Sequence, residues 1–172
     1  MKINIVLYNP EIPQNTGNIM RTSVGTGAVL HLIEPFGFKF DLSILKRSGV
    51  NYLEHLEYHI YKDWQDFKIK NPGRYFFLTR YGRKSPDQCD FTKAGESIYL
   101  IFGKESTGIP KAILREHLDD CLRLPMTDKV RSLNLANTVS IAVYEVLRQL
   151  GYPGLFREEP ESLKGACWLE KE

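Results

Sequence analysis

The sequence is poor in features that mark secreted, metal-binding and membrane proteins. Three of its 172 residues are cysteines (Cys89, Cys121 and Cys167), without CxxC spacing, so neither a disulfide framework nor a zinc site is indicated. No apolar run approaches the roughly 20 residues that cross a membrane, and we expect no membrane partner. The N-terminal residues lack the anatomy of a signal peptide, so we expect a cytoplasmic protein.

Familiar nucleotide-binding and metal-binding motifs are also missing. Gly25-Thr-Gly27 lacks the third glycine of a dinucleotide fingerprint and lies at the end of a predicted helix. Gly103 and Gly108 have the spacing of a phosphate-binding loop, but Lys and Ser do not follow them. His55 and His59 would pair on a helix, but the alternation around them predicts a strand. We therefore expect no metal.

Excess charge of one sign is scarce as well. Lys and Arg number 23 and Asp and Glu 21, and the net charge of +2 does not by itself indicate a nucleic-acid partner. Any basic surface must come from local clustering or from pairing of subunits. The chain is 42% hydrophobic and 26% charged, which is ordinary for a soluble globular protein. We predict one domain over residues 1–155 and a charged tail over 156–172.

What the chain does have is a regular alternation of strand and helix patterns. The predicted strands are 3–8, 29–33, 56–61, 75–79, 97–102 and 121–126. The predicted helices are 16–26, 41–47 and 63–69, one that begins near residue 110, and 132–150. Strand, helix and strand within about thirty residues indicate a parallel α/β sheet. Leu135 and Ala142 widen the apolar stripe of the last helix, either as core or, as we favour, as a subunit interface.

Polar residues crowd the start of the helix predicted from residue 16. Asn15, Thr16, Asn18 and Arg21 lie within seven positions on a helix that otherwise packs on a sheet. Helix capping explains Asn15 or Thr16. It leaves Asn18 and Arg21 unassigned, so we count these two residues as candidates for function.

Two further polar groups follow predicted strands. Glu105 lies in the turn between Gly103 and Gly108, where a carboxylate needs a partner. Ser132 and Asn134 precede the last helix; Ser132 is a good cap for it, and Asn134 is not needed for that purpose. Residues that follow parallel strands meet at one edge of an α/β sheet, where such sheets bind ligands. We therefore expect a small-molecule site there.

Taken together and in this order, these groups resemble the SPOUT-superfamily RNA 2′-O-methyltransferases. The chain is most similar to the members that methylate the wobble nucleotide of leucine tRNAs. The resemblance covers residues 1–155. The matching segments are 11–18 with Arg21, 32–38, 47–49, 102–110, 124–126, 131–135, 144–145 and 148–151.

The resemblance implies a parallel α/β sheet flanked by helices, with a C-terminal deep trefoil knot, in an obligate homodimer. It implies S-adenosylmethionine as cofactor and tRNA, most of all the leucine isoacceptors, as partner. The implied cofactor contacts are Leu78, Thr79, Gly103, Leu124, Met126, Ser132 and Leu133. The implied catalytic residues are Arg21, Glu105, Ser132 and Asn134. The alternative substrates are another tRNA position or rRNA.

The chemistry constrains these roles. A ribose 2′-hydroxyl is a poor nucleophile, so catalysis needs in-line positioning and removal of one proton. A guanidinium keeps its proton at neutral pH, so we assign Arg21 as a phosphate clamp that orients and acidifies the hydroxyl. Ser132 and Asn134 would hydrogen-bond the ribose or the cofactor carboxylate. Glu105 orients Arg21, neutralises it, or accepts the proton, and the sequence leaves these three alternatives open.

We expect RNA contacts from basic and aromatic side chains. The candidates are Asn18, Arg21, Lys39, Lys46, Arg47, Arg80, Arg83 and Lys84, with Phe36, Phe38 or Tyr81 for stacking. An ordinary solvated surface explains these charges equally well. Two other classes compete with the methyltransferase: a nucleotide-dependent dehydrogenase, which the missing glycine fingerprint disfavours, and a noncatalytic RNA-binding protein, which the retained polar groups disfavour.

Overall fold

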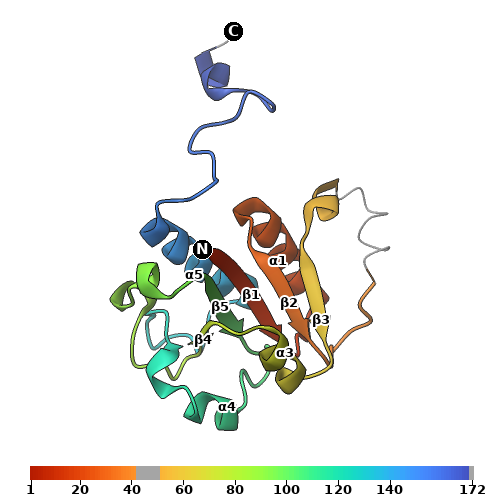
Figure 1. Cartoon of the computed structure of the whole chain (residues 1–172), viewed down its shortest axis with the longest axis vertical. Coiled ribbons are helices and arrows are strands. Elements are labelled where there is room, and N and C mark those ends of the chain that lie inside the picture. Colours follow the sequence, from red (N-terminus) through yellow and green to blue (C-terminus); the bar gives the residue numbers. More distant parts are fainter. Residues whose placement is uncertain (42–50, 171–172) are drawn as a thin grey trace.

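The computed structural model describes residues 1–41 and 51–170. Its strands form one six-stranded sheet in the order β3-β2-β1-β5-β4-β6. Figure 1 shows β3, β2, β1 and β5 side by side. Every neighbouring pair is parallel, so all carboxyl ends meet at one edge. The strands are β1 (Lys2–Tyr8), β2 (Val29–Ile33), β3 (Tyr58–Tyr61), β4 (Arg74–Leu78), β5 (Ser97–Phe102) and β6 (Cys121–Leu122). The parallel α/β sheet predicted from the sequence is confirmed.

Helices cover both faces of this sheet. The α-helices are α1 (Pro13–Thr26), α3 (Trp64–Lys70), α4 (Lys111–Arg115) and α5 (Leu135–Leu150). Single 3-10 turns are η1 (Asn51–His55), η2 (Pro86–Gln88), η3 (Phe91–Lys93), η4 (Leu118–Asp120) and η5 (Ala166–Glu170). One core cluster joins the sheet to α1 and α5, and a second joins its other face to α3 and α4.

Strand β1 illustrates why the sheet is buried on both sides. Ile5 and Leu7 belong to the cluster under α1 and α5, whereas Val6 belongs to the opposite cluster. All three side chains are at most 1% exposed. The run from Ile5 to Leu7 is apolar at every position, as is typical of the centre of a parallel sheet.

Several predicted boundaries and faces need correction. Helix α1 begins at Pro13 rather than residue 16, and α5 begins at Leu135 rather than residue 132. Ala142, which we favoured as an interface residue, is 2% exposed and belongs to the core of its own chain. The alternation of Leu56, Tyr58 and Ile60 with Glu57, His59 and Tyr61 predicts a buried Ile60 and an exposed Tyr61 in β3. The structure shows the reverse, because Ile60 is 43% exposed and Tyr61 is 5% exposed. The predicted helix 41–47, with Lys46 and Arg47, lies almost entirely outside the described residues.

A buried polar network explains the inward position of Tyr61. Its hydroxyl lies 2.9 Å from Nδ1 of His31 and donates to Asn71 at 3.3 Å, and Nε2 of His31 lies 3.0 Å from Oδ1 of Asn4. His31 is 3% exposed, and burial lowers its pKa to about 3. His31 is thus a hydrogen-bonded residue of the core.

The segment after α5 extends away from the sheet and ends in η5 (Figure 1). Phe156 and Leu169 are 80% and 85% exposed. Only the beginning of this segment contacts the core, through Tyr152 and Leu155. Over the part of the chain that the structure describes, no helix combines the length and apolar character needed to cross a membrane.

Candidate functional site

A cavity of about 270 Å³ lies at the carboxyl ends of β4, β5 and β6, beside the start of α5. The last residues of these strands, Leu78, Phe102 and Leu122, form its apolar floor. The loop after β5 and the segment between β6 and α5 complete its lining. The cavity thus occupies the edge at which open α/β sheets bind ligands.

The structure brings most of the predicted site residues together here. The lining includes all seven expected cofactor contacts: Leu78, Thr79, Gly103, Leu124, Met126, Ser132 and Leu133. Glu105 and Arg80 also line the cavity, whereas Arg21, Asn134, Asn18 and Lys39 do not. Lys84 does not line the cavity either; its backbone forms an isolated parallel β-bridge with Leu122, at the outer side of β6.

The loop after β5 exposes its backbone to the cavity because two glycines fold it tightly. A Cβ on Gly103 would lie 2.2 Å from the carbonyl carbon of Gly108, which no side chain tolerates. Gly108 has a φ of +74°, and its N–H donates to the carbonyl of Lys104 at 2.8 Å. Main-chain groups in such a cradle are available to a ligand that a side chain would otherwise exclude.

Glu105 uses its carboxylate to cap a helix that is distant in the sequence. Oε2 accepts the N–H of Glu11 at 2.9 Å, and Oε1 accepts the N–H of Ile12 at 3.2 Å and the amide of Asn15 at 2.9 Å. Helix α1 has Ile12 at its N-cap and no side-chain cap of its own. Capping by Asn15 or Thr16 was therefore wrong; the cap comes from Glu105.

A second carboxylate, that of Glu11 before α1, binds the loop after β5 in return. Glu11 accepts the N–H and the hydroxyl of Ser106, both at 2.9 Å. The hydrogen bond from the Ser106 backbone, followed by that from its side chain, lowers the pKa of Glu11. The start of α1 and the loop after β5 are thus held together by reciprocal hydrogen bonds, in which each segment contributes one carboxylate.

Asn134 extends this connection to α5. Its Oδ1 accepts the N–H groups of Ala136 at 2.9 Å and Asn137 at 3.3 Å, so Asn134, and not Ser132, caps α5. Its Nδ2 donates to Oδ1 of Asn15 at 3.0 Å. We call this series of hydrogen-bonded side chains, Glu105–Asn15–Asn134, the polar chain. It ties a cavity loop to the first turns of both α1 and α5.

Arg21 lies elsewhere on the surface of α1. It is exposed, and its guanidinium carbon lies 4.9 Å from the centre of the Tyr52 ring. Within the described ranges, no ion pair joins Arg21 to Glu105 of the same chain. Glu105 contacts the start of α1, the helix that carries Arg21.

Sequence reasoning missed several residues of the site. The sequence patterns do not single out Glu11 and Ser106, nor Arg123 and Arg131, which line the cavity. No local pattern marks Glu11, because its partner lies 95 residues away. Over residues 1–41 and 51–170, no group of three or more His, Cys, Asp or Glu is placed to hold a metal ion.

A parallel α/β sheet with helices on both faces and a cavity at its carboxyl edge is typical of the α/β proteins that bind small molecules at that edge. Residues 2–144 match the SpoU rRNA Methylase family, and the chain belongs to this family. The methyltransferase resemblance drawn from the sequence motifs is thereby confirmed.

Three known proteins show how closely this chain follows its relatives. It is 44% identical over 154 residues to the tRNA (cytidine(34)-2′-O)-methyltransferase of Escherichia coli K12, covering 88% of this chain and 96% of that protein. A structure solved to explain 2-OH methylation of C/U34 on tRNA is 40% identical, with a TM-score of 0.79 and coverage of 87% and 97%. The AdoMet-bound rRNA methyltransferase of Sinorhizobium meliloti shares the fold at 23% identity, with a TM-score of 0.74 and coverage of 87% and 57%.

Proposed function

We propose that this chain transfers a methyl group from S-adenosylmethionine to the ribose 2′-hydroxyl of a tRNA wobble nucleotide, a cytidine or modified uridine. The observation that carries the proposal is the cavity whose lining includes all seven expected cofactor positions. The relative from E. coli, named for 2′-O-methylation at cytidine 34, supports the choice of substrate. We further propose leucine tRNAs as substrates and the cytoplasm as the place of reaction.

The lining fits the proposed cofactor chemically. Leu78, Leu122 and Leu124 offer an apolar surface to a nucleobase, and the glycine-bounded loop offers main-chain hydrogen bonds. Ser132, which is exposed at the cavity, offers a hydroxyl to the ribose or to a carboxylate. When bound, S-adenosylmethionine supplies the methyl group of its sulfonium. The leaving group is a neutral thioether, which needs no acid assistance.

The protein's own part is positioning. Glu105 and Asn134 are positioning residues, because their polar atoms hold α1 and α5 rather than face a substrate. Arg21 is exposed and does not line the cavity of its own chain, which supports its delivery to the site by a second copy in a homodimer. There its guanidinium clamps a phosphate and orients the hydroxyl for in-line attack.

We also propose that the C-terminal part of the chain forms a deep trefoil knot. Two observations support it: β6 pairs beside β4, and the chain then returns across the sheet so that α5 packs on α1, β1 and β5. A chain that returns in this way passes close to the loops that it has already formed.

The test is to map the methylated nucleotide. The purified protein is incubated with total tRNA and isotopically labelled S-adenosylmethionine, and nuclease fragments are assigned by mass spectrometry. We expect the label on the 2′-oxygen of the wobble nucleotide, chiefly in leucine tRNAs. Label at another tRNA position or only in rRNA would replace the proposed substrate, and no label in any RNA would refute the function.

A further inference from the structure

We propose that Tyr81, under the guanidinium of Arg80 at the mouth of the cavity, is the stacking platform for the base of the nucleotide being methylated. This inference rests on the proposed function and adds to it the group that holds the target base. Both residues lie directly after β4 and line the cavity.

The Tyr81 ring is placed to accept a planar ligand. It is 67% exposed although it lines the cavity, and the guanidinium carbon of Arg80 lies 4.7 Å from the ring centre. A cation over the ring holds it by a cation–π contact. Stacking with a nucleobase would remove the exposed face of the ring from solvent.

The backbone beneath this ring is fixed. The N–H of Gly82 donates to the carbonyl of Thr79 at 3.3 Å, and the Arg123 guanidinium donates to the carbonyl of Arg80 at 2.7 Å. A Cβ on Gly82 would lie 2.4 Å from the carbonyl carbon of Leu122, so the turn is packed directly against β6. A ring on a fixed turn loses little entropy when a ligand binds.

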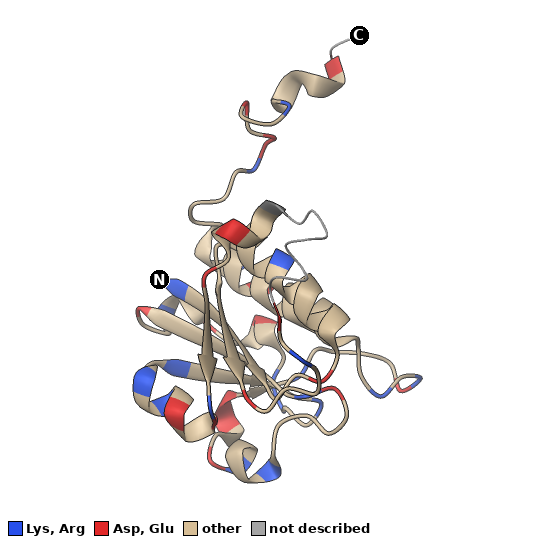
Figure 2. Cartoon of the chain, turned by 90° about the vertical axis from the view of Figure 1, so that its right-hand side faces the viewer, with Lys and Arg blue, Asp and Glu red and all other residues tan. Residues whose placement is uncertain are grey.

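The charges around the ring favour a polyanion. Arg80, Arg123 and Arg131 line the cavity, and the one carboxylate in the lining, Glu105, is engaged by the start of α1. Elsewhere basic and acidic residues are interspersed over the molecule (Figure 2). Phosphates flanking a stacked base would meet guanidinium groups here, as is typical of single-stranded RNA recognition.

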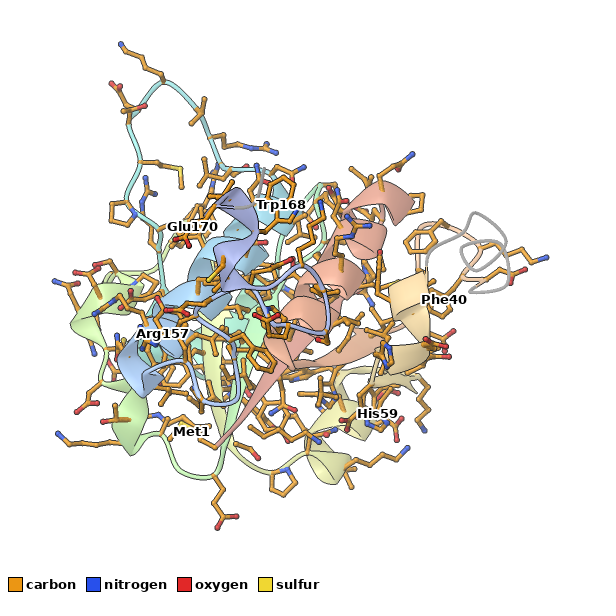
Figure 3. The ribbon with its side chains drawn as sticks, turned by 90° about the horizontal axis from the view of Figure 1, so that it is seen from above. Met1, Phe40, His59, Arg157, Trp168 and Glu170 are labelled. Atoms are coloured by element: carbon orange, nitrogen blue, oxygen red, sulfur yellow. The ribbon has the colours of Figure 1, made fainter. Side chains whose placement is uncertain are left out.

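The other candidate rings are already occupied. Phe36 lies 6.0 Å from Phe38 and 5.5 Å from Phe40, and Phe40 lies 6.0 Å from Tyr58, as distances between ring centres. This group lies at the β3 side of the sheet, where Phe40 is found in Figure 3, and not at the cavity. Of the exposed aromatic side chains over the described ranges, Tyr81 is the one that lines the cavity.

The experiment uses the full-length protein and an anticodon stem–loop RNA that carries the fluorescent base pyrrolocytosine at the wobble position. Tyr81→Ala is compared with Tyr81→Phe and Tyr81→Trp, which keep a ring, and with Phe156→Ala, which alters an exposed aromatic residue outside the cavity lining, as the control. We expect Tyr81→Ala to raise the KM for RNA about ten-fold and to abolish the quenching of the base on binding. Tyr81→Phe, Tyr81→Trp and Phe156→Ala keep the KM for RNA and the quenching of the unaltered protein, and the affinity for S-adenosylmethionine, measured by calorimetry, is unchanged in every variant.

Each other result contradicts the inference in a recognisable way. An unchanged KM and unchanged quenching in Tyr81→Ala would show that the base does not stack on this ring. A lost affinity for S-adenosylmethionine would show that the ring stacks on the cofactor instead. RNA binding that depends on Tyr81 without methyl transfer would refute the proposed function alone, whereas no RNA binding by the unaltered protein would refute both.

Discussion

At the scale of single residues, the carboxylate of Glu105 accepts hydrogen bonds at both of its oxygens from the start of α1. Three N–H groups converge on its two oxygens, from Glu11, Ile12 and the side chain of Asn15. A carboxylate in this setting stabilises the unsatisfied amides of a helix terminus. Of the three roles that the sequence left open for Glu105, positioning of the helix that carries Arg21 is the one its contacts favour.

Glu105→Gln separates positioning from proton transfer. The amide keeps one acceptor oxygen and loses the charge, so we expect the free energy of unfolding to fall by about 1–3 kcal/mol. Methyl transfer slows, but its remaining pH profile keeps the shape of the unaltered protein's. Glu34→Gln, at an exposed position, is the control and changes neither quantity. Activity abolished in Glu105→Gln with unchanged stability would assign Glu105 as the proton acceptor.

Arg21→Ala tests the clamp directly. Because Arg21 lies outside the cavity lining of its own chain, we expect methyl transfer to be abolished and the affinity for S-adenosylmethionine to stay within two-fold. Calorimetry measures the affinity and a filter assay the transfer. Lost cofactor binding in this variant would contradict the assigned role.

His31 makes stability depend on pH. Its pKa of about 3 in the folded protein lies below the 6.5 of an exposed histidine, so the unfolded chain takes up a proton first as the pH falls. The free energy of unfolding therefore decreases from about pH 6.5 downwards, by up to about 1.4 kcal/mol per pH unit. Urea titrations at pH 7 and pH 5 should show a smaller decrease for His31→Gln than for the control His55→Gln, which alters an exposed histidine. Equal decreases would exclude His31 as the cause.

At the scale of elements, the sequence predicts the strands and helices that local patterns determine. It does not predict features that depend on contacts between distant segments. The strand 29–33 matches β2, because apolar β-branched runs between turns define buried strands locally. The start of α1 was placed three residues late, because a local cap was expected at Asn15 or Thr16. The actual cap lies 90 residues further along the chain from Asn15, and no pattern within one segment reports such a contact.

The same distinction applies to the site. The expected cofactor contacts follow from family motifs, whereas the polar chain is visible only in the structure, where three distant segments meet. Ser132 and Asn134 are both plausible caps by residue type, and propensity does not distinguish them. The hydrogen bond from Asn134 to Asn15 does, because it orients the amide so that its oxygen faces the first turn of α5.

Two glycines provide an element-scale test. Gly103→Ala puts a methyl group into the Gly108 backbone, so we expect a loss of about 1–3 kcal/mol in stability and weaker binding of S-adenosylmethionine. Gly25→Ala is the control, since nothing lies within 4 Å of its added Cβ and it is in helix α1. That change should stabilise the protein by about 0.5–1 kcal/mol. Thermal and urea unfolding report both changes, and a tolerated Gly103→Ala would show that the loop is looser than its geometry indicates.

At the scale of the whole molecule, the account requires two copies of the chain. Ile141 and Tyr144 on α5 are 47% and 50% exposed, an apolar surface suited to a subunit interface. These residues replace Ala142 as the interface candidates. A shared site would then combine the cavity of one copy with Arg21 of the other.

Mixing two inactive variants tests this sharing. Arg21→Ala keeps the cavity, and Met126→Trp fills it. After unfolding and refolding of an equal mixture, half of the dimers are mixed and each holds one complete site, so activity should return to about a quarter of the unaltered level. No recovery, with mixed dimers verified by mass spectrometry, would place Arg21 and the cavity of one site in the same chain.

Titration of the purified protein with S-adenosylmethionine, followed by calorimetry, tests the central claim most directly. The account predicts one binding site per chain, lost in Met126→Trp and retained in Ile69→Trp, which alters an exposed position on α3. No binding by the unaltered protein, or equal affinity in Met126→Trp, would contradict the claim that the methyl donor occupies the cavity.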